Sequence, residues 1–142
     1  MEHDFVAKVS VTANAPLAQV WDALVNPEVI KRYMFGATVV SEWKKGSPIV
    51  WKGEWKGKPY EDKGVILEIM PRRLLRYSHF SPLSGAKDVP ENYHTVQVQL
   101  SEEGGRVRID LSQDKNRADE ARIHSEKNWS MMLDGLKRAI ES

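Results

Sequence analysis

Two histidines and a tyrosine are the side chains of this sequence best suited to acid–base chemistry. Tyr77 and His79 share one face of a predicted strand, because alternate residues of a strand point to the same side. A long loop follows His79, and His94 lies just beyond it, so a hairpin would bring the two histidines together. Imidazole titrates near neutral pH, so an inward pair could bind the acidic group of a ligand or act as an acid–base pair. A structural or exposed position is the alternative, and a one-residue slip in register would put Tyr93 in the place of His94.

The tryptophans mark a second candidate feature. The chain has five Trp but only three Phe, and the bulky indole with its N–H donor often lines cavities and interfaces. Strand phase puts Trp51 and Trp55 on one face, and helical phase puts Trp129 on the apolar stripe of a C-terminal helix. These rings could converge with Tyr77 on one pocket, with plain core packing as the alternative. Trp21 fits plain core better than a pocket, and the place of Trp43 stays open.

Charged groups give weaker signals. Arg122 and Met132 lie on the inner stripe of the C-terminal helix, and an arginine at the mouth of a pocket could pair with a ligand carboxylate. The alternative is that its head reaches solvent or a nearby acid. The acidic residues on predicted strands show no spacing that selects a catalytic pair, so we expect them on a salt-bridged sheet surface. They are Glu54, Glu61, Asp62, Glu68 and Asp110.

Several function classes lack their sequence signals. The chain has no nucleophile elbow, phosphate-binding loop or dinucleotide fingerprint. It has no Cys, and only two histidines are in phase, so we expect neither a disulfide scaffold nor a metal site. Twenty-one Lys and Arg against 20 Asp and Glu give a net charge of +1, which offers no basic surface for nucleic acid. We therefore expect no cofactor and no nucleic-acid partner.

The hydrophobic pattern predicts one α+β domain over residues 1–142. The length and the 41% content of hydrophobic residues suffice for a single core. Asn14 and Asn26 are candidate caps of two short helices after the first strand, and Asn116 is the candidate cap of the long C-terminal helix. Short connections favour an antiparallel sheet, curved around that long helix. Its strands are predicted at residues 5–12, 38–43, 48–55, 60–70, 73–80, 93–100 and 105–112.

Three segments carry a more specific pattern through their order and spacing. They are residues 15–24 with Asn26-Pro27-Glu28, residues 64–71 leading into Leu75-Arg76-Tyr77-Ser78, and residues 128–137. Together they resemble the AHSA-type family, named for homology to the heat-shock-protein ATPase activator, within the START-related superfamily (also called SRPBCC or birch-pollen-allergen-like). The resemblance implies a helix-grip fold with a cavity between sheet and C-terminal helix, and no shared catalytic triad or metal motif. Two departures border that cavity: Lys45-Gly46-Ser47-Pro48 replaces a Gly-Gly turn, and His79 replaces a Trp.

These features favour a non-catalytic protein that binds a hydrophobic or amphipathic small molecule. A cyclase- or dehydratase-like enzyme that uses the His and Tyr side chains is the alternative, and a chaperone-associated module is the third hypothesis. With neither a leader peptide nor an 18-residue apolar run, we expect a cytoplasmic protein without a membrane partner. A monomer and a homodimer are both open. The candidate ligand contacts are Trp51, Trp55, Tyr77, His79, His94, Arg122, Trp129 and Met132.

Overall fold

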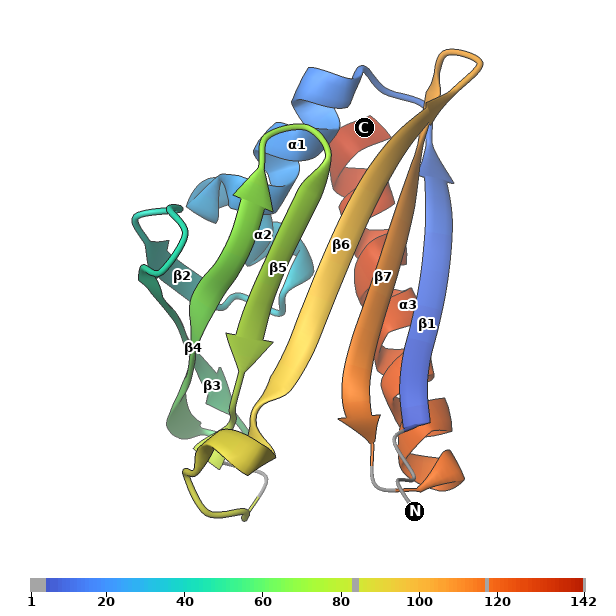
Figure 1. The fold of residues 1–142 in the computed structure, drawn as a ribbon. Coiled ribbons are helices and arrows are strands. Elements are labelled where there is room, and N and C mark those ends of the chain that lie inside the picture. Colours follow the sequence, from blue (N-terminus) through green and yellow to red (C-terminus); the bar gives the residue numbers. More distant parts are fainter. Residues whose placement is uncertain (1–4, 83–84, 117, 142) are drawn as a thin grey trace.

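A single antiparallel sheet of seven strands forms the framework of the protein (Figure 1). The computed structural model describes residues 5–82, 85–116 and 118–141, and Trp55 by its backbone alone. The strands follow the spatial order β1-β7-β6-β5-β4-β3-β2, so β1 and β2 form the two edges. The strands are β1 (Phe5–Ala13), β2 (Thr38–Ser41), β3 (Pro48–Trp55), β4 (Lys58–Met70), β5 (Leu74–His79), β6 (His94–Glu103) and β7 (Arg106–Asn116).

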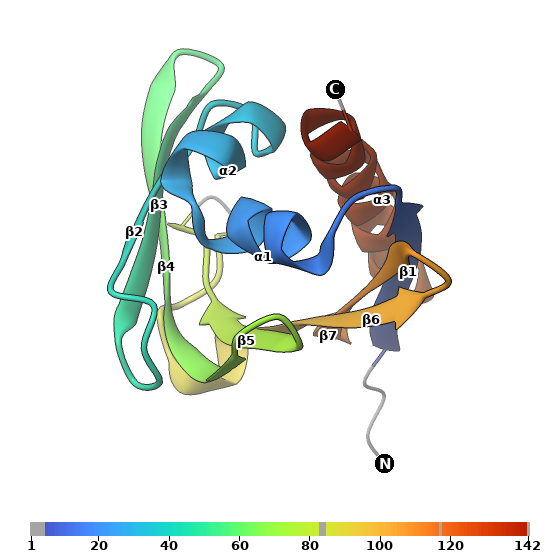
Figure 2. The same cartoon turned by 90° about the horizontal axis from the view of Figure 1, so that it is seen from above.

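The helices lie together on the concave side of the bent sheet (Figure 2). They are α1 (Leu17–Val25), α2 (Pro27–Tyr33) and the long α3 (Asp119–Glu141), and a 3-10 turn, η2 (Pro90–Asn92), precedes β6. Helix α3 packs on β1 and β7, whereas α2 packs on β2 and on α3. This arrangement confirms the predicted α+β helix-grip fold. Within the described chain, no helix is both long enough and apolar enough to cross a membrane.

The core lies where the apolar faces of sheet and helix meet. On β6 and β7, Val98 pairs with Leu111 and Leu100 pairs with Ile109, which confirms the predicted hairpin. Their inward faces are buried because the strand period of two matches the alternation of apolar residues. The most deeply buried large side chains are Ile49, Ile66, Ile109, Leu133 and Leu136, with Val20, Val96 and Val107.

The predicted helix caps were correct at one position and wrong at two. Asn26 caps α2, and its side chain accepts a hydrogen bond from the Glu28 N–H at 3.0 Å. Asn14 does not cap α1, which begins at Leu17 without a side-chain cap; its N–H instead donates to Glu141 at 2.6 Å. Asn116 is the last residue of β7, which extends four residues beyond its predicted end. Its buried amide is used within the sheet, where it donates to the Phe5 carbonyl at 2.9 Å.

Candidate ligand site

The inner face of the sheet becomes more polar and more accessible toward one end. Along β5, Leu75 is 3% exposed and Tyr77 is 5% exposed, whereas the side chain of His79 is 27% exposed. The neighbouring β4 changes in the same direction, from Ile66 at 0% to the Asp62 side chain at 16%. This end of the inner face is therefore where polar side chains come within reach of solvent.

The same change occurs on three further elements. The inner faces of β6, β7 and α3 are buried in the middle of the molecule and half-buried at this end. The strand register brings these ends together, because Val96 of β6 pairs with both Tyr77 of β5 and Gln113 of β7. We call the half-buried residues the polar end of the inner face. They are Tyr60 and Asp62 on β4, His79 on β5, His94 on β6, Gln113 on β7 and Trp129 on α3.

A histidine–carboxylate pair lies in this polar end. His79 Nε2 is 3.0 Å from Asp62 Oδ2. An ionised carboxylate only accepts hydrogen bonds, so Nε2 is the donor of this contact, and a neutral His79 ring then has its lone pair on Nδ1. The second oxygen, Asp62 Oδ1, is buried and has no hydrogen-bond partner among the described residues. The pair therefore offers one imidazole nitrogen to the polar end, while the second carboxylate oxygen stays buried and unsatisfied.

The second histidine lies beside the first. His94 and His79 are directly paired across β6 and β5, so both side chains project from the same face. His94 Nδ1 donates to the Asp114 carbonyl at 2.9 Å, so Nε2 is the acceptor when the ring is neutral. Asp114 also holds the strand end through its side chain, which accepts from the Thr95 N–H at 2.6 Å. Each imidazole thus has one nitrogen engaged by the protein and the other available.

Aromatic rings form the floor next to this pair. The Trp51 ring lies 5.0 Å from the His79 ring and 5.2 Å from the Tyr77 ring, with tilted or edge-on geometry. Both Trp51 and Tyr77 are buried. Burial raises the pKa of Tyr77, so its hydroxyl stays neutral, and it makes no hydrogen bond to the described residues. A neutral hydroxyl of this kind can donate to or accept from a ligand.

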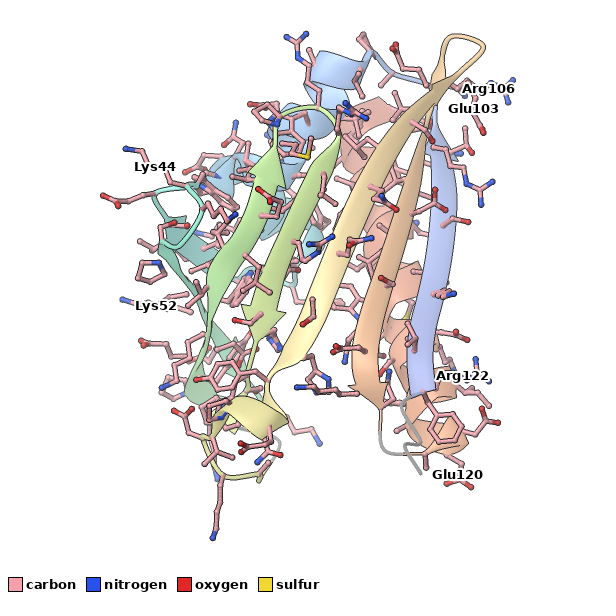
Figure 3. All side chains as sticks on the ribbon, in the orientation of Figure 1. Lys44, Lys52, Glu103, Arg106, Glu120 and Arg122 are labelled. Carbon is pink, nitrogen blue, oxygen red and sulfur yellow. The ribbon has the colours of Figure 1, made fainter. Side chains whose placement is uncertain are left out.

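The remaining predicted ligand contacts are three residues of α3 and Trp55 of β3. Trp129 donates its Nε1–H to Gln113 Oε1, which fixes the indole against β7, and Met132 is buried one turn further along α3. Arg122 is held by Asp119 and Glu126 at 2.8 and 2.9 Å, at the end of α3 beside the start of β1 (Figure 3). Its guanidinium is therefore already paired with two carboxylates. The side chain of Trp55 lies outside the described residues.

Three members of the polar end were absent from the candidates chosen from the sequence. Asp62 was expected on a salt-bridged sheet surface; it does pair with His79, but on the inner face that it shares with Trp51, its partner across β3 and β4. The sequence pattern that indicates an inward Asp62 is its even spacing from the buried Ile66, because alternate residues of a strand share a face. Gln113 keeps the phase of Ile109 but lies one residue past the predicted end of its strand. Tyr60 covers Gly53, where an added Cβ would lie 2.6 Å from the Tyr60 hydroxyl oxygen.

The described residues contain no group of three or more His, Cys, Asp or Glu side chains that could hold a metal ion. The site is therefore built from aromatic rings, two imidazoles, one carboxylate and neutral polar groups. Such a set can enclose a small molecule with apolar walls and orient it through a few hydrogen bonds.

Comparisons with known proteins agree with this architecture. The sequence model described as "Activator of Hsp90 ATPase homolog 1-like protein" matches residues 14–141. The solution structure of ChR145 from Cytophaga hutchinsonii is 57% identical, with a TM-score of 0.88, and the alignment covers 99% of this chain and 97% of that one. No curated protein matches the chain.

Two more distant structures share the fold. CalU16 from Micromonospora echinospora is 21% identical, with a TM-score of 0.73, over 97% of this chain and 85% of that one. The Aha1 dimer from Colwellia psychrerythraea is 17% identical, with a TM-score of 0.73, over 96% of each chain. At these identities the similarity shows the fold alone.

Proposed function

Because this chain belongs to the family of Activator of Hsp90 ATPase homolog 1-like proteins, we propose that it binds a hydrophobic or amphipathic small molecule between the sheet and α3. The observation that carries the proposal is the gradient along the inner face. Leu75 is 3% exposed and the His79 side chain is 27% exposed, and apolar side chains give way to polar ones at the same end of β4, β5, β6 and β7, where α3 adds the half-buried Trp129.

The composition of this end suits such a ligand. Trp51, Tyr77 and Trp129 supply flat apolar surface from both the sheet and the helix. Few polar groups accompany them, and His79 and His94 each keep one uncommitted ring nitrogen. Binding sites for small molecules commonly combine mostly apolar walls with a small number of orienting polar groups. Arg122 is left out of the proposed contacts, because two acids already neutralise it.

Intrinsic tryptophan fluorescence provides the test. We expect naphthalene and dodecanoate, titrated separately into the protein, to change the emission with saturation. Trp51→Leu should weaken the binding of the better probe about tenfold, since it removes one wall of the site. Trp21→Phe is the matched control, because Trp21 lies on α1 away from the polar end, and it should leave the affinity unchanged. Absence of a saturable change with both probes would refute the proposal.

A second candidate function is supported by the His79–Asp62 pair. A carboxylate that holds one imidazole nitrogen orients the other as a general base, as proton-transfer enzymes require. The activity would be of the cyclase or dehydratase kind, which begins with proton removal next to a carbonyl. Exchange of the central hydrogens of 1-phenylbutane-1,3-dione in D₂O, followed by NMR, tests it. No acceleration over buffer would exclude this candidate.

A further inference from the structure

We infer that the site recognises its ligand as a hydrogen-bond donor: a neutral ring compound that carries a hydroxyl group, held by His79 with Asp62 as the positioning residue. The inference rests on the proposed function and specifies the chemistry of the ligand. It depends on the hydrogen-bond polarity of the groups at the polar end of the inner face.

The available groups at this end are mainly acceptors. Nε2 of His79 is committed as donor to Asp62 Oδ2 at 3.0 Å, so Nδ1 is the acceptor when the ring is neutral. Nδ1 of His94 is committed as donor to the Asp114 carbonyl at 2.9 Å, so Nε2 is an acceptor. Asp62 Oδ1 is buried and has no partner among the described residues, so it adds negative charge to this end without itself reaching a ligand. A ligand that brings only acceptors would leave both imidazole acceptors unpaired.

The charge of this end points the same way. The Asp62 carboxylate has no Lys or Arg partner among the described ion pairs: Lys63, next in sequence, pairs with Asp88, and Arg122 pairs with acids on its own helix. With neutral imidazoles, the polar end therefore carries one negative charge. A carboxylate ligand would add a second negative charge close to the first, whereas a hydroxyl adds none.

Asp62 gives His79 its role in this scheme. When a ligand O–H donates to Nδ1, its proton can pass to the ring, and the resulting imidazolium keeps its Nε2–H on the Asp62 carboxylate. The ligand oxygen then holds the negative charge and accepts from the new Nδ1–H. The step moves one proton and requires no other reactant. Asp62 would act through His79 by fixing the tautomer and stabilising the charged ring.

A series of naphthalene probes distinguishes the possibilities, with EDTA present to exclude metal bridging. We expect 2-naphthol to bind at least about tenfold more tightly than 2-methoxynaphthalene, which has the oxygen but no donor. The charged 2-naphthoate should bind most weakly. Bound 2-naphthol should also show a red-shifted absorption band, because the O–H is polarised toward naphtholate. Equal binding of 2-naphthol and 2-methoxynaphthalene would overturn the inference, and so would tightest binding of 2-naphthoate.

Variants test the assignment to particular residues. In Asp62→Asn, we expect the preference for 2-naphthol over 2-methoxynaphthalene and the red shift to be lost, while 2-methoxynaphthalene still binds. His79→Gln should behave likewise, which keeps the test usable should one variant not fold. His124→Gln, on the exposed side of α3, is the matched control and should retain the preference. A preference that survives both site variants would refute the role of this pair. If naphthalene binds and 2-naphthol gains nothing, the inference fails while the proposed function stands.

Discussion

The phenol of Tyr33 shows how one polar atom can join two elements inside the core. Its ring is buried, and its hydroxyl donates to the carbonyl of Ala23 at 2.7 Å, which ties α2 to α1. Burial raises the pKa of Tyr33, so the hydroxyl remains a donor throughout the ordinary pH range. Tyr33→Phe should lower the free energy of unfolding by about 1–2 kcal/mol, because it leaves a buried carbonyl without this partner. Urea unfolding measures the loss.

Tyr60→Phe is the control for this prediction. The Tyr60 hydroxyl makes no hydrogen bond to the described residues, and the residue is only half-buried. Its removal should change the free energy of unfolding by less than about 0.5 kcal/mol. Similar losses in the two variants would show that the Tyr33–Ala23 hydrogen bond contributes nothing of its own.

At the scale of residues, sequence phase put Trp51, Tyr77 and His79 on the inner face but left Asp62 out. Trp51, Tyr77 and His79 could be put on one face because apolar residues flank them at a period of two. Asp62 obeys the same period, yet an acid on a strand is usually at the surface, so residue type outweighed phase. Strand phase alone could not predict that Asp62 pairs with His79, because this contact is diagonal between two strands and depends on the twist of the sheet.

At the scale of elements, the side chains of Lys63, Asp88 and Tyr93 form a contact that holds the connection between β5 and β6 in place. Lys63 of β4 pairs with Asp88, which also accepts from the Tyr93 hydroxyl at 2.6 Å. The Tyr93 ring in turn stacks on Phe80, with centroids 5.2 Å apart. The Lys63 and Tyr93 hydrogen bonds lower the pKa of Asp88 below its ordinary value of 3.8. This connection leaves the sheet directly beside His79 and His94, at the polar end of the inner face.

The pH dependence of this contact follows from the lowered pKa of Asp88. A depressed carboxyl pKa means that the contact stabilises the fold fully above the ordinary value of 3.8 and loses this contribution as the pH falls through the lowered value. We therefore expect the NMR signals of the Tyr93 ring to stay constant from neutral pH until the pH falls below the ordinary carboxyl pKa of 3.8. A change centred near neutral pH would contradict this assignment.

Asp88→Asn tests the same contact at neutral pH. Removal of the charge should expose the connection, so the backbone amides of residues 85–89 should exchange hydrogen faster than in the unmodified protein. Glu91→Gln changes an exposed acid of the same connection and serves as the control, with an unchanged exchange rate. Because the Lys63 and Asp88 side chains are about half exposed, added salt should reduce the difference between the variants.

A second element-scale prediction concerns the close approach of β4 and β5. A Cβ added at Gly64 would lie 1.7 Å from the backbone oxygen of Ser78. Backbone cannot move aside as a side-chain end can, so Gly64→Ala must push the two strands apart. We expect a loss of about 3 kcal/mol in the free energy of unfolding, the upper part of the range for overpacked sites.

Gly135→Ala provides the comparison for Gly64→Ala. An added Cβ at Gly135 on α3 would lie 3.3 Å from the Tyr33 Cβ, which small shifts can relieve. The gain in helix propensity, about 1 kcal/mol, opposes the remaining crowding. The thermal transition temperature of Gly64→Ala should therefore be far below that of Gly135→Ala. Equal transition temperatures would contradict the role assigned to the β4–β5 approach.

At the scale of the whole molecule, the architecture could be predicted because it follows from periodicity and connection length. The change from helical to strand period after residue 37, the short turns and the single long amphipathic segment together permit little besides a curved sheet around one helix. The ends of elements were harder to predict. Strand β7 extends to Asn116 because long-range pairing continues the ladder past the last apolar residue, and such pairing leaves no local signal in the sequence.

The side chain of Asn116 connects three elements of the fold. It donates to the Phe5 carbonyl at 2.9 Å and to the Gln113 carbonyl at 3.1 Å, and its oxygen accepts from the Ser125 hydroxyl at 2.8 Å. These contacts join the start of β1, the end of β7 and the first part of α3. Asn116 is 4% exposed, so water cannot take the place of its amide in a variant that lacks it.

Asn116→Ala should therefore lower the free energy of unfolding by about 2–3 kcal/mol, at roughly 1 kcal/mol for each of the three hydrogen bonds. Asn128→Ala, on the exposed face of α3, should cost less than about 0.5 kcal/mol. Urea unfolding of Asn116→Ala, Ser125→Ala and the double variant separates the shared contribution: the double variant should lose clearly less than the sum of the single losses. Additive losses would mean that the Asn116–Ser125 hydrogen bond does not hold α3 to the sheet. The attachment of α3 at this end would then depend on its other contacts with the sheet, which include the Lys8–Glu126 and Trp129–Gln113 hydrogen bonds.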